Sequence, residues 1–167
     1  FYIWDEAFHK EDIEKAALLT NLFYKYAPDK FNLAILIPSY NPVLTWENGN
    51  FEPYVKEFVN AIEPPVICFD YYPYGVSPQK DDEYQLDTSN LWKDLGAMRV
   101  EGLKRNIPFW FYYQACRVNP YPYFEPSMIR LQLNYALMYG AKGLQCYGLS
   151  GTTASMYNWE DKYMVVD

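Results

Sequence analysis

Five apolar stretches alternate with four amphipathic stretches along this chain, and this alternation restricts the fold more than any other feature. The apolar stretches have the length and composition of strands that are buried on both faces, and the stretches between them repeat apolar residues at helical spacing. Each connection is long enough for a right-handed crossover between parallel strands. The sequence therefore predicts an α/β fold with parallel strands alternating with helices.

The expected elements follow in order. Strands are predicted at residues 1–4, 31–37, 66–69, 107–113 and 143–147, and helices at about 11–26, 51–62, 90–105 and 126–139. The polar segment 77–90 is predicted to be an exposed loop, and the residues from Gly148 onward have no assigned structure.

Two architectures fit this order: an open doubly wound sheet, or a consecutive piece of a (β/α)8 barrel. Neither the dinucleotide fingerprint GxGxxG nor the phosphate-loop pattern follows any predicted strand, which removes the commonest functions of an open nucleotide-binding sheet. A complete barrel needs roughly 250 residues. The chain has 167 residues, so in the second case it would form only part of the barrel.

Charge and composition exclude several classes of partner. The formal net charge is −7 and no Lys/Arg cluster is present, which argues against nucleic acid and against anionic membranes. No apolar run reaches the ~18 residues of a membrane span. The three cysteines show no CxxC spacing and His9 is the only histidine, so we expect no metal site and no cofactor. No signal peptide is visible, and export would need a targeting segment outside this sequence.

The opening stretch carries the first candidate for a working residue. Aromatic and β-branched residues lead directly into Asp5 and Glu6. In parallel α/β folds ligands bind at the carboxyl ends of the strands, so Glu6 is expected to enter a cleft. Burial near Tyr2 and Trp4 would raise its pKa. Alternatively, Asp5 and Glu6 form a solvated strand end that helps to start the next helix.

Aromatic content indicates the kind of ligand. The chain has 18 Tyr, 10 Phe and 5 Trp, enough to supply both a core and a cleft whose rings stack on flat ligands such as sugars.

Several segments, taken together and in order, resemble one enzyme family. They are Tyr2-Ile-Trp-Asp-Glu-Ala7, Cys68-Phe-Asp-Tyr-Tyr-Pro73, Ile107-Pro-Phe-Trp-Phe-Tyr-Tyr-Gln114 and Tyr139-Gly-Ala-Lys-Gly-Leu-Gln-Cys-Tyr147. The set resembles the barrel of β-galactosidase-like, family 42-type glycoside hydrolases of the retaining (β/α)8 clan. The resemblance implies that residues 1–150 are the C-terminal portion of a TIM barrel, strands four to eight, and that 151–167 form a tail or a final loop and helix.

The resemblance also implies roles for two residues. The acid/base glutamate of the clan, at the end of strand four, corresponds to Glu6. The nucleophile glutamate stands at the end of strand seven, where this chain has Gln114. Glutamine cannot form the glycosyl-enzyme ester, so the chain departs from the pattern of a retaining enzyme.

Glycoside hydrolysis needs two carboxyl groups, and Asp70 is the best-placed second one. It ends a predicted strand on the same rim as Glu6. Its alternative role is to form the turn that follows, by bonding to its own backbone. Asp5 would point to the opposite face of a strand from Glu6, and Glu47 and Glu125 lie in predicted loops.

Polar and aromatic residues near strand ends are the expected substrate contacts. They are Tyr72, Trp110, Tyr113, Gln114 and Tyr147. Only alternate strand residues face the barrel interior, so about half of the aromatic residues must pack in the core. Tyr72 and Tyr113 are the favoured stacking surfaces, and Gln114 either bonds a sugar hydroxyl or is a satisfied interior amide.

Two functions follow from these residues. In the first, the chain is part of a glycoside hydrolase with Glu6 as general acid/base and Asp70, or a residue outside this chain, as its partner. In the second, suggested by Gln114, it is a non-catalytic carbohydrate-binding or scaffold barrel. In both, upstream residues or a partner chain are expected to complete the barrel, because a partial barrel leaves strand edges unpaired.

Overall fold

A computed structural model describes residues 1–41, 43–44, 50–77, 80–86, 88–115, 126–147, 157–158 and 163–164. In chain order its elements are β1 (Tyr2–Trp4), α1 (Lys10–Tyr26), β2 (Leu33–Leu36), α2 (Phe51–Ile62), β3 (Ile67–Tyr71), β4 (Tyr74–Ser77), β5 (Lys80–Leu86), α3 (Leu91–Arg105), β6 (Phe109–Gln114), α4 (Pro126–Tyr139), β7 (Gly143–Tyr147), β8 (Tyr157–Asn158) and β9 (Tyr163–Met164).

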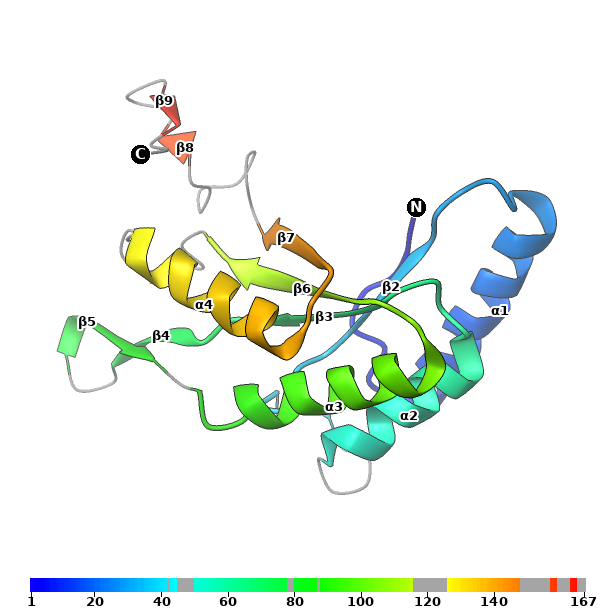
Figure 1. The fold of residues 1–167 in the computed structure, drawn as a ribbon, viewed down its shortest axis with the longest axis horizontal. Coiled ribbons are helices and arrows are strands. Elements are labelled where there is room, and N and C mark those ends of the chain that lie inside the picture. Colours follow the sequence, from blue (N-terminus) through cyan, green and yellow to red (C-terminus); the bar gives the residue numbers. More distant parts are fainter. Residues whose placement is uncertain are drawn as a thin grey trace.

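The main sheet has five strands in the order β1-β2-β3-β6-β7, and every neighbouring pair is parallel (Figure 1). The strands therefore follow one another across the sheet in chain order. A doubly wound sheet would reverse this order at a switch point. No reversal occurs in the described sheet, so the open doubly wound architecture is wrong and the order is that of consecutive barrel strands.

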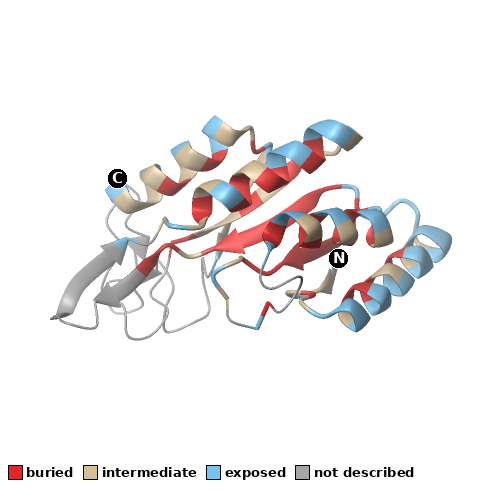
Figure 2. Cartoon of the chain, turned by 90° about the horizontal axis from the view of Figure 1, so that it is seen from below, coloured by how far each residue is buried: buried red, intermediate tan, exposed pale blue. Residues whose placement is uncertain are grey.

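The helices cover one face of this sheet. Alternate residues of β3, namely Ile67, Phe69 and Tyr71, join the same buried cluster as α2 and α3. This cluster is the main core, and in Figure 2 the strands are buried while the helices turn exposed sides outward. The predicted pattern of strands buried on both faces is confirmed for β2 and β3, whose residues are all buried.

The opposite face of the sheet carries a second, smaller cluster. Leu33, Ile35 and Cys68 are buried there, and Trp110 and Tyr112 pack against them. This face corresponds to the interior of a barrel, and Asp70 and Tyr112, which are register partners, lie at its carboxyl end.

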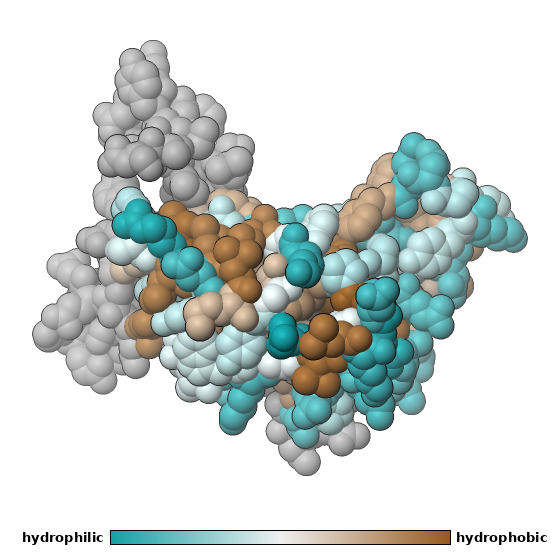
Figure 3. Space-filling view, in the orientation of Figure 1, coloured by the Kyte–Doolittle hydropathy of each residue, from teal (hydrophilic) through white to brown (hydrophobic). Residues whose placement is uncertain are grey.

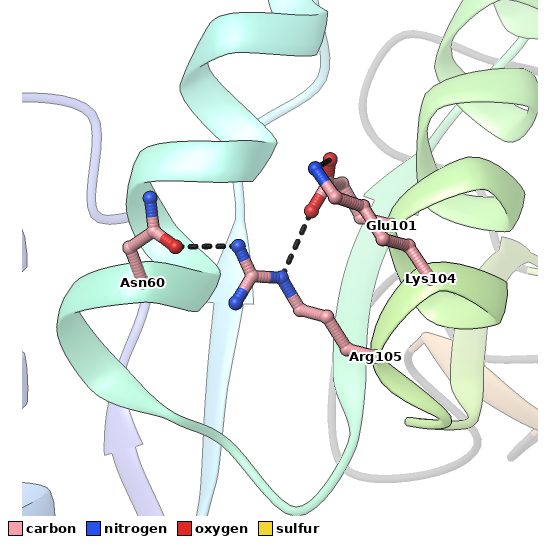
Figure 4. Close-up of polar contacts among 4 residues, drawn as sticks. All are labelled: Asn60, Glu101, Lys104 and Arg105. Atoms are coloured by element: carbon pink, nitrogen blue, oxygen red, sulfur yellow. Dashed lines mark hydrogen bonds and ion pairs between the residues drawn. The ribbon is translucent and has the colours of Figure 1, made fainter.

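One arginine joins the C-terminal ends of α2 and α3 (Figure 4). Arg105 donates from Nη2 to Asn60 Oδ1 on α2, and from Nε to Glu101 Oε2 at 2.9 Å. Lys104 adds an ion pair to Glu101 at 3.7 Å. Glu101 is almost fully buried, so these partners neutralise a charge that would otherwise be costly between the helices.

The prediction of an exposed loop at 77–90 is wrong. β4 and β5 form an antiparallel hairpin there, with Tyr74 opposite Leu86. Lys80–Leu86 is rich in charged residues and shows no run of apolar side chains. The hairpin is held by backbone pairing, which leaves little hydrophobic signal in the sequence.

Large apolar side chains remain exposed on several helices, α3 and α4 among them. Val100 and Leu103 on α3 and Leu137 and Met138 on α4 are each more than half exposed, and apolar patches lie over these helices in Figure 3. None of the described helices is long and apolar enough to cross a membrane.

Candidate functional site

Glu6 lies in the turn that follows β1, and its backbone is unusual. The strand ends at Trp4, and Glu6 has a φ of 49°, in the left-handed region that residues with a side chain rarely adopt. The strand alternation that would have separated Asp5 from Glu6 therefore does not extend to these residues. Glu6 is half-buried, so its carboxyl group is partly accessible.

Asp70 approaches Glu6 from β3. Its side chain is 6% exposed, and its carboxyl group lies close enough to Glu6 and to the Tyr72 hydroxyl for both to act on its pKa. Asp70 Oδ1 is buried and has no hydrogen-bond partner among the described residues. A buried carboxylate oxygen without a donor is costly when it is charged, so this position favours the protonated form of Asp70.

The electrostatics of the pair favour the same state. Burial, followed by the charge of Glu6, raises the pKa of Asp70 to about 7, although the hydrogen bond from Tyr72 opposes this shift. Burial also raises the pKa of Glu6, the charge of Asp5 raises it further, and the polar interaction with Asp70 lowers it. Asp70 therefore keeps a proton up to about neutral pH, beside the carboxyl group of Glu6.

Two tyrosines extend the site from the pair toward β7. Tyr72 follows β3, and its ring lies 5.1 Å from that of Tyr147, the last residue of β7, at an angle of 40°. Tyr147 is 43% exposed. Burial and the charge of Asp70 raise the pKa of Tyr72. The structure therefore brings four predicted site residues together: Glu6, Asp70, Tyr72 and Tyr147.

Tyr40, from the turn after β2, also reaches this group, and the sequence analysis did not single it out. Its hydroxyl accepts a hydrogen bond from Tyr72 N at 3.4 Å, and its ring stands edge-on to Tyr71 at 4.8 Å. Burial raises its pKa, and the charges of Asp70 and Glu6 add to this. Its position directly after a predicted buried strand, at the same rim as Glu6 and Asp70, was the available signal.

Tyr2 and Asp5 form a second polar contact beside the pair. The Tyr2 hydroxyl donates to Asp5 Oδ1 at 2.6 Å. Burial raises the pKa of Tyr2, with smaller contributions from Asp5, Tyr112 and Asp70. The residues at these strand ends thus include several carboxylates and phenol hydroxyls, groups that suit a ligand with many hydroxyls.

Both the side chain and the backbone of Gln114 form hydrogen bonds inside the protein. It is 1% exposed, its Oε1 accepts from Tyr74 N at 3.1 Å, and its Nε2 donates to Tyr74 O at 3.2 Å. The Gln132 side chain of α4 binds both the N–H and the C=O of Gln114, at 2.9 and 2.8 Å. These bonds match the alternative of a satisfied interior amide, and a contact of Gln114 with a sugar stays a prediction.

Trp110 and Tyr113 lie apart from the carboxyl pair. Trp110 packs on the barrel-interior face, and its ring stacks on Phe31, which precedes β2, at 5.3 Å. Tyr113 packs against the helix-side cluster, and its register partner on β7 is Cys146. The structure does not bring either residue to Glu6, and their roles in substrate binding stay predictions.

Some expectations fall on other parts of the chain. Glu47, Glu125 and Cys116 lie outside the described residues. Cys68 and Cys146 are free thiols. Among the described residues no group of three or more His, Cys, Asp or Glu side chains could hold a metal ion.

A described cavity lies elsewhere. It has a volume of about 500 Å³ and lies between the beginnings of α2 and α3, lined by Ser39, Asn50, Asp94 and Gly96 among others. None of the predicted site residues lines it, so the carboxyl pair lies outside this cavity.

Comparison with known proteins identifies the fold. No model of a known protein family matches the chain, and no curated protein matches it either. Among solved structures, the chain is similar to one described as a "putative alpha-L-fucosidase" from Bacteroides thetaiotaomicron, with a TM-score of 0.59 and 10% sequence identity. The match covers 87% of this chain and 47% of the other, so this chain spans about half the length of that structure. The chain therefore has an α/β fold of five parallel strands alternating with helices that matches part of a glycosidase barrel.

Proposed function

We propose that this chain forms part of a glycoside hydrolase in which Glu6 is the general acid/base and Asp70 its proton-sharing partner. The observation that carries the proposal is the neighbouring position of these two carboxyl groups at the carboxyl ends of the strands, where each acts on the pKa of the other, in a fold similar to part of a glycosidase. Active sites of (β/α)8 enzymes lie at that end of the barrel.

The two carboxyl groups differ in burial, and this difference supports different roles for them. Glu6 is half-buried and can reach a glycosidic oxygen, whereas Asp70 is almost fully buried. A general acid needs a proton at working pH, and the raised pKa of the pair keeps one there. In this mechanism the single proton of the pair passes from Glu6 to the leaving oxygen, which leaves both carboxyl groups charged, and a proton taken from the attacking water restores the pair.

The burial of Asp70 argues against it as the carboxylate on the opposite side of the scissile bond. Glycosidases place those two groups on either side of the sugar, ~5 Å apart when they retain and ~6.5–9.5 Å apart when they invert configuration. Asp70 is 6% exposed, so its carboxyl group is not open to a sugar. We therefore assign the opposing carboxylate to a part of the protein outside the described residues.

Tyr72 and Tyr147 are the best-supported sugar contacts. The ring of Tyr72 neighbours that of Tyr147, and Tyr147 is exposed. A sugar ring bound to Glu6 could therefore stack on these two rings. Trp110, Tyr113 and Gln114 complete the predicted set, with weaker geometric support.

The rest of the barrel belongs to the same proposal. β1 and β7 form the two edges of the described sheet, and the chain spans about half of the fucosidase structure. We propose that further β/α units, upstream in the same polypeptide or on a partner chain, pair with these edges and complete the mouth around Glu6.

A second candidate function rests on Gln114. Both polar atoms of its amide are used by backbone bonds at the strand end where a retaining enzyme carries its nucleophile. This favours a barrel that binds carbohydrate without cleaving it.

The test is hydrolysis of aryl glycosides, including p-nitrophenyl α-L-fucoside and β-D-galactoside, by the intact protein. Glu6→Gln should lower kcat/KM by about 10²–10⁴-fold, the usual contribution of a general acid. Glu63→Gln is the matched control, because Glu63 also has a left-handed backbone (φ 48°) but is exposed at the end of α2. Equal activity of the Glu6→Gln and wild-type proteins would remove Glu6 from the mechanism. Sugar binding measured by calorimetry without turnover would favour the second candidate.

A further inference from the structure

The backbone at Glu6 is held in a conformation that it would not adopt by itself. A left-handed conformation is unfavourable for a residue with a side chain, and it persists only where the surroundings impose it. The next residue, Ala7, is fully buried and is bonded on both sides. Its N–H donates to Ile35 O at 3.3 Å, and its C=O accepts a hydrogen bond at 2.6 Å from the hydroxyl of Tyr54.

Tyr54 makes this contact from α2, on the helix side of the sheet. Its side chain is fully buried, and its ring packs beside Phe51, with 5.8 Å between the ring centroids. The same hydroxyl accepts a hydrogen bond from Ile37 N at 3.2 Å, directly after β2. The Tyr54 hydroxyl therefore links the turn after β1 to the end of β2 through two hydrogen bonds.

The groups around Tyr54 keep its hydroxyl protonated, so that it can donate a hydrogen bond. Burial raises its pKa, and the charges of Glu6, Asp70 and Asp12 add to the shift, although the hydrogen bond from Ile37 opposes it. The hydroxyl therefore stays protonated over the pH range in which the carboxyl pair titrates.

We propose that Tyr54 is the positioning residue of the site: its hydroxyl, through Ala7, holds Glu6 in the left-handed conformation that places its carboxyl group against Asp70. This inference rests on the proposed function for its catalytic meaning, whereas the geometric claim stands without it. Tyr54 acts through the backbone and does not itself touch a substrate.

The experiment compares Tyr54→Phe with Tyr24→Phe in the intact protein. Each variant loses one hydroxyl that donates a hydrogen bond to a backbone carbonyl. Tyr24→Phe is the control, because the Tyr24 hydroxyl donates to Glu63 O at 3.1 Å at an exposed position on the helix side. Two quantities are measured: the pKa of the Glu6 carboxyl by ¹³C NMR, and kcat and KM on aryl glycosides.

In Tyr54→Phe the turn after β1 is released, so Glu6 becomes more solvated and separates from Asp70. The pKa of Glu6 should fall toward its ordinary value, because burial is the main cause that raises it. The value of kcat should fall on the order of tenfold or more, since small displacements of a catalytic group cost that much, while KM stays within about twofold. Tyr24→Phe should change none of these. A folded Tyr54→Phe protein with the wild-type pKa of Glu6 and the wild-type kcat would overturn the proposal.

The proposed function and the positioning role fail separately. If the wild-type protein hydrolyses no glycoside, the NMR titration still tests whether Tyr54 positions Glu6. If Tyr54→Phe alone does not fold, the comparison is repeated in a Gly96→Ala background, where the added methyl group meets open space. Loss of folding in both backgrounds would assign Tyr54 to stability and overturn its positioning role.

Discussion

The carboxyl groups of Glu6 and Asp70 lie close enough to shift each other's pKa although β2 separates their two strands in the sheet. Glu6 bridges this distance because the chain leaves the strand geometry after Trp4 and turns at a left-handed residue. A buried carboxyl pair of this kind holds a proton at a pH where isolated carboxylates have lost theirs.

The pair makes activity dependent on pH. A general acid must be protonated, so kcat/KM should fall as the pH rises through about 7, the pKa of Asp70. Asp70→Asn removes the neighbouring charge and leaves Glu6 to titrate alone, which should move this fall to lower pH. The measurement is kcat/KM between pH 4 and pH 9.

The control for this pH profile is Asp94→Asn. Asp94 is also buried, and burial raises its pKa to about 6, but it lies at the start of α3 and bonds Ser39 N. The fall near pH 7 should remain in that variant. An unchanged profile in Asp70→Asn would show that the proton of the pair does not limit the reaction.

Tyr147 should contribute to binding rather than to folding. Its side chain is 43% exposed and its ring pairs with Tyr72. Aromatic contacts contribute about 0.5–1.5 kcal/mol, so Tyr147→Ala should weaken sugar binding by roughly 2- to 10-fold, measured by calorimetry. Tyr26→Ala, at a 72% exposed position on α1, is the control. Equal affinity of both variants would remove Tyr147 from the ligand surface.

Two glycines test the packing of the sheet. A Cβ at Gly143 would meet three Trp110 ring atoms at 2.5 Å, whereas a Cβ at Gly96 on α3 meets nothing within 4 Å. Gly143→Ala should therefore lower the free energy of unfolding by about 1–3 kcal/mol. Gly96→Ala should raise it by about 0.5–1 kcal/mol, through helix propensity. Urea unfolding measures both, and equal effects would contradict the pairing of Trp110 with Gly143 in β6 and β7.

The sequence predicted the elements that bury apolar side chains and missed those that do not. α2 and β7 have the predicted bounds because their apolar residues lie at regular spacing between clear breakers such as Pro64 and Gly148. The β4–β5 hairpin was missed because β5 consists largely of charged and polar residues, which do not show the apolar pattern of a buried strand.

The site was partly predictable for a related reason. Glu6, Asp70, Tyr72 and Tyr147 stand at strand ends, and parallel strands bring those ends to one rim. Tyr54 could not be found in this way. In the sequence it belongs to the apolar face of a helix, and its role depends on two backbone groups that only the folded chain brings to its hydroxyl.

The most direct test of the central claim is a ¹³C NMR titration of the carboxyl groups of Glu6 and Asp70 in the intact protein. The account predicts two coupled steps, the higher near pH 7, with the signals of both residues responding to each step. Glu6→Gln should remove the coupling and lower the pKa of Asp70, because the charge of Glu6 raises it. Independent titration of both groups near pH 4 would show that no proton is shared and would contradict the account.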